Sequence, residues 1–456
     1  MRKTIGLAVI FLLAALCVFA GGSQEKAVGA EPSWPIKLKV DTAQGGDGLV
    51  LLRAAAADFN ASQDKYVVDL TQAGSYTEIQ TRIITSTLAD RPAIFAASGT
   101  GSAAFITKDE ASRLYVPAHD FIMADGYDMS TLISNLKTNY CLDGEWQCLP
   151  LGNTSVGQFF NNDILKACGI DIDSLKSYDE ILVACEKLAA AGYKQPYYLR
   201  TDYSDYLNYS LTAQGINYFD MDNGRDGIPT KSLFDDGAEC QAATTAYFAF
   251  AKALATKGYM VPVNVSASTA RQMIVEKQIV IMDGYSSGAN AVIKLVGDLA
   301  NPFDLQYRVS PVIQKGAKYH GQAPGGGVLF IAKTNEWTEQ GAWEFMKWLM
   351  QDKYTSAYAM ATGYIPITTT GAQTPEYQAY INNTFPNAAD VIREQNNTEP
   401  NIAYARVPFT SDYEAIFVEI VKRVCTDAAY TPERACADLA KRTNEAIELY
   451  RMGVGL

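Results

Sequence analysis

The stretch Gly325–Thr370, GGGVLFIAKTNEWTEQGAWEFMKWLMQDKYTSAYAMATGYIPITTT, decides the fold. It opens on three glycines, whose missing Cβ atoms allow left-handed backbone angles and the close approach of another molecule. The apolar run Val328–Ala332 predicts a buried strand. A first helix follows, and a second one starts after the predicted N-cap Asp352 and ends at Gly363. The first helix has one apolar face, formed by Ala342, Phe345, Met346, Leu349 and Met350.

After the second helix the chain continues as Tyr364-Ile365-Pro366-Ile367, and the proline keeps the residue before it extended. The glycine run and Tyr364 therefore stand at opposite ends of one strand–helix unit, where both can face a cleft. The alternative for the same residues is a tight turn and a core tyrosine.

In order and spacing this stretch resembles the C-terminal signature of family 1 extracellular solute-binding proteins of ABC importers. It is most similar to the branch that includes glycerol-3-phosphate- and sugar-binding proteins. The shared features are the glycine run, an A-W-x-F-x-K-[WF]-L helix and a T-G-Y-[LI]-P ending. Further matches lie upstream, at Phe59-Asn60-Ala61-Ser62-Gln63, Gly74-Ser75-Tyr76, Asp143-Gly144 with Leu149-Pro150, and Phe159-Phe160-Asn161-Asn162-Asp163. Together these matches cover most of the exported chain.

The first part of the chain alternates between predicted strands and helices. Ile36–Val40, Tyr66–Leu70 and Ala93–Ala97 are predicted strands, and Leu49–Asn60 and a helix opening at Tyr76 lie between them. This order predicts parallel βαβ units, which bind ligands at the carboxyl ends of their strands. Tyr76 and the loop that begins at Ser98 both fall at such ends.

The resemblance implies an α/β, two-lobe periplasmic-binding-protein fold. Its discontinuous lobes are joined by crossover segments around a ligand cleft. We expect lobe 1 to comprise residues 34–151 and 312–366, and lobe 2 to comprise residues 152–311 and 367–456.

The N-terminal region predicts export. Residues 1–20 combine a positive start, an apolar run and a small-residue cleavage site, as in a secretory signal peptide. Residues 21–33 are small and polar, which predicts a flexible tether. Cleavage before Cys17 with lipid attachment there is the alternative to cleavage after Ala20. Either route places the mature protein in the periplasm or outside the cell.

The composition argues against nucleic acid as a binding partner. The formal net charge is −12, with 19% charged and 48% hydrophobic residues. An acidic chain does not attract nucleic acid, whose binding requires clustered Lys and Arg. The balance is that of a globular protein, and its length suits two domains with substantial cores. We expect a monomer that needs no cofactor.

Eight cysteines are present, and their spacing in an oxidising compartment suggests local pairs. Cys141 and Cys148 flank the hairpin signal Asp143-Gly144, and Cys425 and Cys436 bracket a predicted joint between two helices. We expect these four residues to form two disulfides, with buried free thiols as the alternative. Cys17 lies in the predicted signal peptide, and the sequence leaves open whether Cys168, Cys185 and Cys240 pair.

The sequence offers no catalytic constellation. It lacks a Gly-x-Ser-x-Gly elbow, an HExxH helix and a P-loop, and nothing pairs the two carboxylates that a glycosidase needs. No CxxC occurs and only His119 and His320 are available, so a metal site is not expected. The stretch 220–226 is similar to a calcium loop, but its spacing does not fit and a solvated turn is expected.

The resemblance implies a ligand site position by position. In the resembling glycerol-3-phosphate binders, the matching motifs supply a tyrosine, an acidic residue, small hydroxyls, a tryptophan, the glycine run, a second tyrosine and a late arginine. The positions here are Tyr76, Ser98 in the loop after the third strand, Thr154 or Ser155, Tyr203 or Tyr206 in place of the tryptophan, Gly326, Tyr364 and Arg406. Ala97 occupies the acidic position, so that carboxylate is absent.

Tyrosines are dense between residues 193 and 209, where each offers an apolar face and a hydroxyl to a sugar ring. Most of them should cover helices, and one or two should reach the cleft.

We therefore expect a solute-binding protein that closes around a small ligand, a sugar or oligosaccharide, and delivers it to the transmembrane subunits of an ABC permease. A glycerol-3-phosphate or glycerophosphodiester ligand is one alternative. A ligand-sensing adaptor for a chemoreceptor or sensor kinase is another, and a secreted carbohydrate hydrolase is a third.

Overall fold

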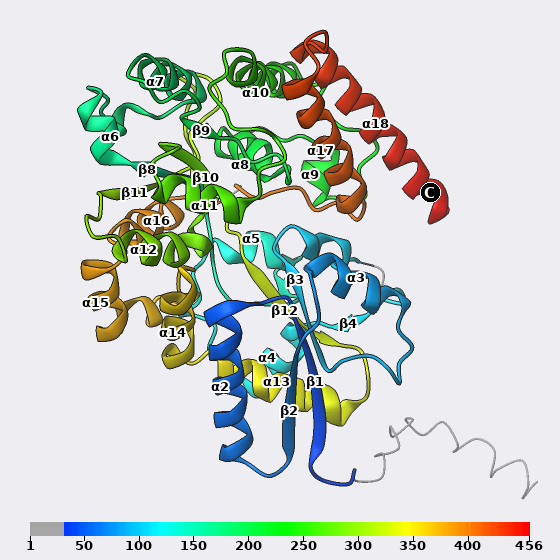
Figure 1. Ribbon diagram of the computed structural model, residues 1–456. Helices are drawn as coiled ribbons and strands as arrows, with labels where there is room; N and C mark the ends of the chain where they lie inside the picture. Colours follow the sequence, from blue (N-terminus) through cyan, green and yellow to red (C-terminus); the bar gives the residue numbers. More distant parts are fainter. Residues whose placement is uncertain (1–31, 109, 401) are drawn as a thin grey trace, which may run out of the picture.

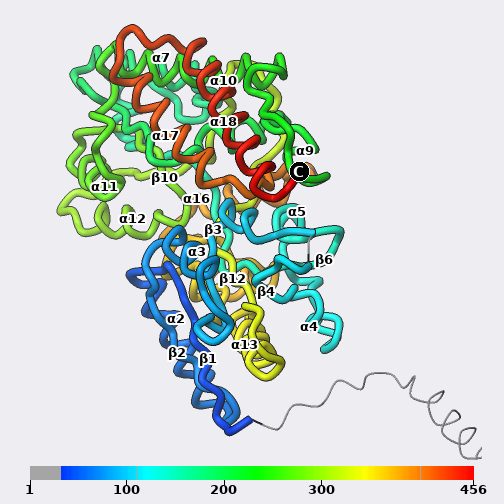
Figure 2. The backbone as a smooth tube through the Cα atoms, turned by 90° about the vertical axis from the view of Figure 1, so that its right-hand side faces the viewer, coloured from blue at the N-terminus to red at the C-terminus, as the bar shows by residue number. Residues whose placement is uncertain are grey.

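A computed structural model describes residues 32–108, 110–400 and 402–456, which form two α/β lobes with a gap between them (Figure 1). The predicted signal peptide, Cys17 and nearly all of the predicted tether lie outside the described residues. Each lobe is built on its own β-sheet, and the side view in Figure 2 shows the same division. The predicted two-lobe α/β architecture is confirmed.

The first sheet has the strand order β2-β1-β3-β12-β4, and β7 also pairs with β12. Its strands are β1 (Ile36–Thr42), β2 (Tyr66–Gln72), β3 (Ile94–Ser98), β4 (Tyr115–Val116), β7 (Leu149–Pro150) and β12 (Gly327–Ala332). The first three run parallel, with Ile36 opposite Tyr66 and Val40 opposite Ile94. Their carboxyl ends therefore meet at one edge of the sheet, which is the edge that faces lobe 2.

Helices α2 (Gly46–Ser62) and α3 (Tyr76–Thr85) connect these parallel strands. Ser75 caps α3: its side chain accepts from the backbone N–H of Glu78, whose carboxylate accepts from the N–H of Ser75 at 2.6 Å. This reciprocal capping box fixes the start of the helix, and with it the position of Tyr76.

The opening stretch folds largely as predicted. β12 is fully buried, and α13 (Glu336–Leu349) buries its apolar face in the core of lobe 1. The helix α14 (Asp352–Thr362) ends at Gly363, which has the left-handed φ of 92°. The predicted N-cap Asp352 is wrong by one residue, because Gln351 occupies the cap position. The Asp352 carboxylate instead accepts from the hydroxyls of Thr368 and Thr370, at 3.0 and 2.7 Å.

The second sheet has the order β11-β8-β10-β9. Its strands are β8 (Val156–Asn161), β9 (Tyr197–Tyr198), β10 (Ile281–Tyr285) and β11 (Leu305–Val309). The largest hydrophobic cluster of lobe 2 contains residues of this sheet and of five helices. They are α7 (Tyr178–Ala190), α8 (Asp205–Ala213), α10 (Ala238–Thr256), α17 (Thr410–Thr426) and α18 (Pro432–Gly453).

The remaining helices and strands are short or peripheral. They are η1 (Gly101–Ala104), α4 (Ala118–Asp125), α5 (Leu136–Tyr140), β5 (Cys141–Leu142), β6 (Glu145–Trp146), α6 (Asn162–Ala167), η2 (Ile172–Ser174), α9 (Asp220–Gly224), α11 (Ala267–Val275), η3 (Ser286–Gly288), α12 (Ala289–Gly297), η4 (Gly371–Gln373), α15 (Pro375–Asn383) and α16 (Asn387–Asn396). None of the helices in the described part of the chain is long and apolar enough to cross a membrane.

The chain passes between the lobes more than once. The chain crosses from the first sheet to the second between β7 and β8. It crosses back from the second sheet to the first between β11 and β12. These crossovers are tied together, because Asn153 bridges to Ile365 and Thr154 to Gly325. The exact residue boundaries proposed for the lobes stay predictions.

The two expected disulfides are absent, because the four cysteines are free thiols. Cys141 stands opposite Trp146 in the predicted hairpin, and Cys148 lies beyond the end of β6. Cys425 Sγ points to the carbonyl of Ala251 at 4.0 Å, whereas Cys436 Sγ points to that of Phe234 at 3.1 Å. Each thiol therefore packs against a different part of lobe 2.

Candidate ligand-binding site

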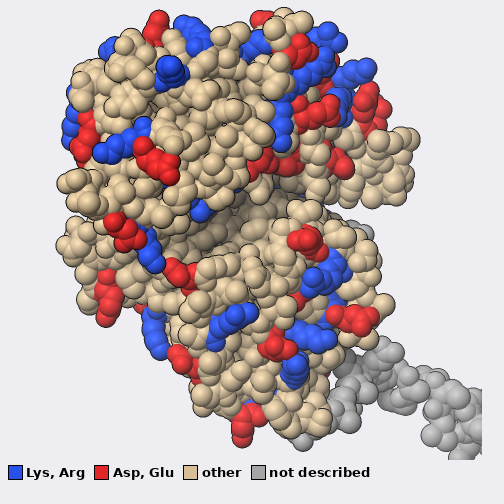
Figure 3. Space-filling view, viewed as in Figure 1, with Lys and Arg blue, Asp and Glu red and all other residues tan. Residues whose placement is uncertain are grey.

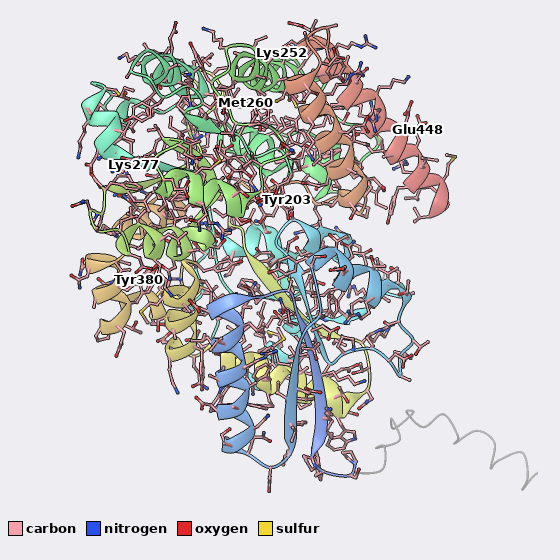
Figure 4. All side chains as sticks on the ribbon, in the orientation of Figure 1. Tyr203, Lys252, Met260, Lys277, Tyr380 and Glu448 are labelled. Carbon is pink, nitrogen blue, oxygen red and sulfur yellow. The ribbon has the colours of Figure 1, made fainter. Side chains whose placement is uncertain are left out.

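A cavity of about 200 Å³ lies between the lobes. It is lined by Tyr76, Ser98, Gly99, Thr100, Thr154, Arg200, Tyr203, Asp205, Tyr209, Tyr285, Ser287, Gly326, Tyr364 and Tyr404, and we call it the tyrosine cleft. Figure 3 shows the hollow between the two lobes, with walls that are mostly uncharged. Figure 4 places Tyr203 at the level of this gap. The ring of Tyr203 is 44% exposed, so it is free to cover a ligand.

The wall from lobe 1 is built on the carboxyl ends of parallel strands. Ser98 ends β3, and its Oγ accepts from the backbone N–H of Gly101 at 2.9 Å, which shapes the loop. Tyr76, the first residue of α3, accepts at its hydroxyl from Gln44 Nε2 at 2.8 Å. Burial raises the pKa of Tyr76 and of Tyr364, so both phenols stay protonated and can donate to a ligand.

The three glycines Gly325–Gly327 allow the tyrosines and the crossover segment of this wall to pack closely against the backbone. A Cβ on Gly325 would lie 2.4 Å from the hydroxyl of Tyr209, and one on Gly327 would lie 2.6 Å from that of Tyr76. Gly326 has a φ of 118°, and a Cβ there would stand 2.1 Å from the carbonyl oxygen of Gly152. Side chains at these positions would therefore push apart the crossover segments and the tyrosines that line the cleft.

On the wall from lobe 2, Arg200 is held between two aromatic rings. Its guanidinium carbon is 4.9 Å from the ring centre of Tyr203 and 4.7 Å from that of Tyr285. The same guanidinium makes a forked ion pair with Asp202, at 2.8 and 3.2 Å. The positive charge of Arg200 is thus already matched by a carboxylate, and its plane is fixed by stacking.

Asp205, the first residue of α8, brings a carboxylate to the cleft. Its Oδ2 accepts from the hydroxyl of Tyr285 at 2.6 Å. Behind it, Glu414 of α17 accepts from the backbone N–H and the hydroxyl of Ser204, at 2.8 and 2.5 Å. Burial and the charge of Asp205 raise the pKa of Glu414 to about 8, and burial also raises the pKa of Asp205. Near neutral pH the buried Glu414 therefore holds a proton, which spares the pair mutual repulsion.

A second buried carboxylate positions this segment. Asp283 of β10 accepts from the backbone N–H of Arg200 at 3.0 Å and from the hydroxyl of Tyr197 at 2.5 Å. Burial raises the pKa of Asp283 to about 6, against hydrogen bonds that lower it. Asp283 thus anchors the chain at the point where it turns into the cleft.

Six of the predicted ligand residues lie together on the cleft, namely Tyr76, Ser98, Thr154, Tyr203, Gly326 and Tyr364. The hydroxyl of Thr154 accepts from the backbone N–H of Ser287 at 3.0 Å, so it links the segment before β8 to η3. That these residues contact a ligand stays a prediction.

Three predicted ligand residues lie outside the lining of the cleft. Ser155 is buried, and its Oγ is 3.2 Å from the hydroxyl of Tyr307. Tyr206 is buried on α8, with its hydroxyl 3.4 Å from the carbonyl of Gly157. Arg406 turns away, because its guanidinium donates to the carbonyls of Cys141 and Asn139 at 2.6 and 3.3 Å.

The sequence reasoning missed six of the lining side chains, which are Arg200, Asp205, Tyr209, Tyr285, Ser287 and Tyr404. The first three fall in or beside the tyrosine-dense segment 193–209, so its composition was a usable signal. Tyr285 and Ser287 follow β10, and only the pairing of that strand with β8 brings them to the cleft. Within the described residues there is no cluster of three His, Cys, Asp or Glu side chains that could hold a metal ion.

Comparison with known proteins gives concordant results. The profile of a family described as bacterial extracellular solute-binding protein matches residues 54–385. The sn-glycerol-3-phosphate-binding periplasmic protein UgpB of Agrobacterium fabrum is 23% identical over 321 residues, covering 69% of this chain and 70% of that protein.

Solved structures share the fold at low sequence identity. Maltose-bound MalE3 of T. maritima superimposes with a TM-score of 0.71 at 17% identity, covering 91% of this chain and 100% of the other. UgpB of Mycobacterium tuberculosis in complex with glycerophosphocholine gives a TM-score of 0.71 at 16% identity, covering 92% and 100%. At such identities these likenesses establish the two-lobe architecture and do not identify a ligand.

Proposed function

The chain belongs to the bacterial extracellular solute-binding protein family, and from this we propose that it captures a neutral carbohydrate in the tyrosine cleft and delivers it to an ABC permease. The family and its structural neighbours are binding proteins rather than enzymes. The observation that carries the proposal is a cleft lined by six tyrosines, whose only described cation, Arg200, is already paired with Asp202.

The lining suits a sugar in shape and in chemistry. Tyrosine rings cover the apolar C–H faces of a pyranose, and their hydroxyls bond its rim. Asp205 adds a strong acceptor for ligand hydroxyls, and Thr154 and Ser98 add smaller ones. Asp205 therefore takes the place of the carboxylate that is missing at Ala97. The cleft volume of about 200 Å³ favours a mono- or disaccharide over a longer chain.

A glycerophosphate compound is the second candidate. It is supported by the name of the Agrobacterium relative, by the ligand of the Mycobacterium structure, and by the presence of Arg200 in the cleft. Against it, a phosphate would have to displace or share Asp202 and would lie near the carboxylate of Asp205. Like charges at such short range are unfavourable, so we place the neutral sugar first.

The mechanism that follows is hinge closure. The ligand contacts walls from both lobes, so it binds the closed arrangement more strongly and shifts the population toward it. The proposal also includes export through residues 1–20, an optional lipid anchor on Cys17, a monomeric state and delivery to a permease. A role as an adaptor for a chemoreceptor or sensor kinase is the alternative, and loss of solute uptake on gene deletion would argue against it.

Calorimetry on ligand-stripped protein tests the ligand class. We expect titrations with neutral mono- and disaccharides to give saturable heats, and glycerol-3-phosphate and glycerophosphocholine to give none at similar concentrations. The Arg200→Gln variant should weaken sugar binding only modestly, because its guanidinium is engaged with Asp202. Tight glycerol-3-phosphate binding that is abolished in Arg200→Gln would reverse the assignment.

A further inference from the structure

A second and larger cavity, of about 440 Å³, also lies between the lobes. It shares no lining residue with the tyrosine cleft, and a small cavity lined by Gly99 and Tyr404 together with both arginines lies between the two. One side comes from lobe 1, with Ile84, Phe105 and Leu142, and the other from lobe 2, with Ile228 and Tyr450. In Figure 1 the end of α18 faces α3 across the gap on this side of the molecule. We call this space the arginine cavity, after Arg225 and Arg406, which also line it.

Arg406 brings a positive charge that no carboxylate neutralises in the described part of the chain. Its guanidinium is partly buried and donates to the carbonyls of Cys141 and Asn139. Arg225 and Arg406 line the same space, and burial together with the charge of Arg225 lowers the pKa of Arg406. A partly buried guanidinium that faces no carboxylate is unfavourable, and an anion beside it would relieve this cost.

Arg225 is held rigidly toward the same space. Its two terminal nitrogens donate to the carbonyls of Asp222 and Ala403, at 2.8 and 3.0 Å. Its ion pair with the half-exposed Asp222 carboxylate is longer, at 3.5 Å. The whole chain carries a net charge of −12, so a cavity with two arginines does not follow from its average composition.

The backbone that presents Arg225 is strained. The single turn α9 has left-handed φ angles of 53°, 50° and 54° at Met221, Asp222 and Asn223, followed by 79° at Gly224. A Cβ on Gly224 would lie 2.1 Å from the carbonyl oxygen of Arg406. Non-glycine residues in this region are strained, and such residues gather at functional sites. The stretch 220–226, expected to be a plain solvated turn, thus packs against the backbone of Arg406, whose N–H donates to the carbonyl of Asn223 at 2.8 Å.

The other walls of the arginine cavity are mostly apolar, apart from Thr107, Ser112 and Lys108, whose ammonium pairs with Asp143 at 3.1 Å. Phe105, Ile106 and Leu142 are buried, and Ile84 is 58% exposed although it borders the cavity. Such a lining suits a hydrocarbon or aromatic body, and the two arginines suit a carboxylate or phosphate group.

We propose that the arginine cavity is a second binding site, for a small organic anion whose carboxylate or phosphate meets Arg225 and Arg406 and whose apolar body lies against Phe105 and Ile228. Because walls from both lobes form the site, an occupant bridges them. The proposal does not rest on the carbohydrate function proposed for the tyrosine cleft.

Calorimetric titration of the full exported chain with matched probes tests the proposal. Benzoate and phenyl phosphate carry both an anion and a ring, benzyl alcohol carries the ring alone, and acetate carries the anion alone. We expect the first two to bind at least about tenfold more tightly than the last two. Arg225→Gln should weaken benzoate at least about tenfold, and Ile228→Glu, which places a carboxylate in the cavity, should abolish its binding.

Two variants act as controls. Arg393→Gln removes an exposed arginine elsewhere and should leave benzoate affinity unchanged. Arg200→Gln should also leave it unchanged, which distinguishes the arginine cavity from the tyrosine cleft. Thermal melts confirm that each variant folds. The proposal is overturned by three results: no benzoate or phenyl phosphate binding up to about 10 mM, equal affinity for acetate, or binding lost in Arg200→Gln and kept in Arg225→Gln.

Discussion

Asp205 brings a carboxylate to the tyrosine cleft. The side chain enters the cleft from lobe 2 and is held by the hydroxyl of Tyr285. Arg200 stands beside it but is engaged with Asp202. At the scale of single residues, the cleft therefore offers acceptors and neutral donors rather than a free cation.

Asp205→Asn should weaken sugar binding. A hydrogen bond between a ligand hydroxyl and a carboxylate contributes about 1.5–3 kcal/mol, so we expect the Kd to rise roughly ten- to a hundredfold. Calorimetry with the best sugar of the panel measures this. Asp173→Asn, a change at an exposed carboxylate outside the cleft, is the matched control. Equal affinity in the two variants would show that Asp205 does not contact the ligand.

Glu414 makes stability depend on pH. Its pKa rises from 4.5 to about 8 on folding, so between these values the folded state binds a proton that the unfolded chain has released. The stabilisation is complete below the lower value and is lost as pH rises toward the upper one. Urea unfolding should therefore show the free energy of unfolding falling more steeply from about pH 5 to about pH 8 in the wild type than in Glu414→Gln.

Glu419→Gln is the control for this experiment, because Glu419 lies on the same helix and Arg442 lowers the pKa of its exposed carboxyl. It titrates below the window, so its variant should keep the wild-type slope. If the Glu414→Gln and wild-type curves run parallel, Glu414 does not hold the extra proton.

Among the elements, β12 and the glycine run before it have the largest influence on the site. β12 returns from lobe 2 to pair antiparallel with β3, with Gly327 opposite Ser98. Its glycines let the backbone pass against Gly152 and beneath the hydroxyls of Tyr76 and Tyr209. One short segment thus sets the spacing of the crossovers and of the aromatic side chains.

Gly326→Ala should destabilise the protein by about 1–3 kcal/mol, since alanine at a φ of 118° is strained and its Cβ would meet the carbonyl of Gly152. It should also weaken sugar binding, because the crossover must move. Denaturant unfolding and calorimetry measure the two effects. Gly297→Ala is the control, because nothing lies within 4 Å of a Cβ there and no strain is expected. Equal stability of the two variants would contradict the predicted strain.

For the whole molecule, the two lobes have separate sheets and meet through crossovers and a contact around α5. Asn139 of α5 donates to the carbonyl of Pro324 at 2.8 Å, and its own carbonyl accepts from Arg406. The two interlobe cavities have separate linings. Relative motion of the lobes would therefore change the shape of both cavities.

Binding of the preferred sugar should make the molecule more compact. A ligand that contacts both walls favours closure, so the radius of gyration from small-angle X-ray scattering should fall at saturation. The Asp205→Asn variant at the same sugar concentration should show less compaction, in proportion to its lower occupancy. Identical scattering profiles with and without saturating sugar would rule out closure.

The sequence alone determined the architecture and pointed to six of the residues that line the tyrosine cleft. Helical and strand periodicities predicted β12, α13 and the parallel strands of lobe 1, because these patterns follow from burying one face of each element. The G-S-Y and G-Y-I-P motifs led to Tyr76 and Tyr364, which lie on the cleft because each stands at the end of a local unit.

Only the tertiary structure decided the rest. Tyr285 and Ser287 reach the cleft through the pairing of β10 with β8, and Tyr404 through the chain that returns from α16. Arg406 was expected in the cleft and instead bonds to lobe 1 carbonyls, because the direction of a loop side chain is set by long-range contacts. Local sequence specifies the period and the ends of an element, but which side chains converge depends on contacts between residues far apart in the chain.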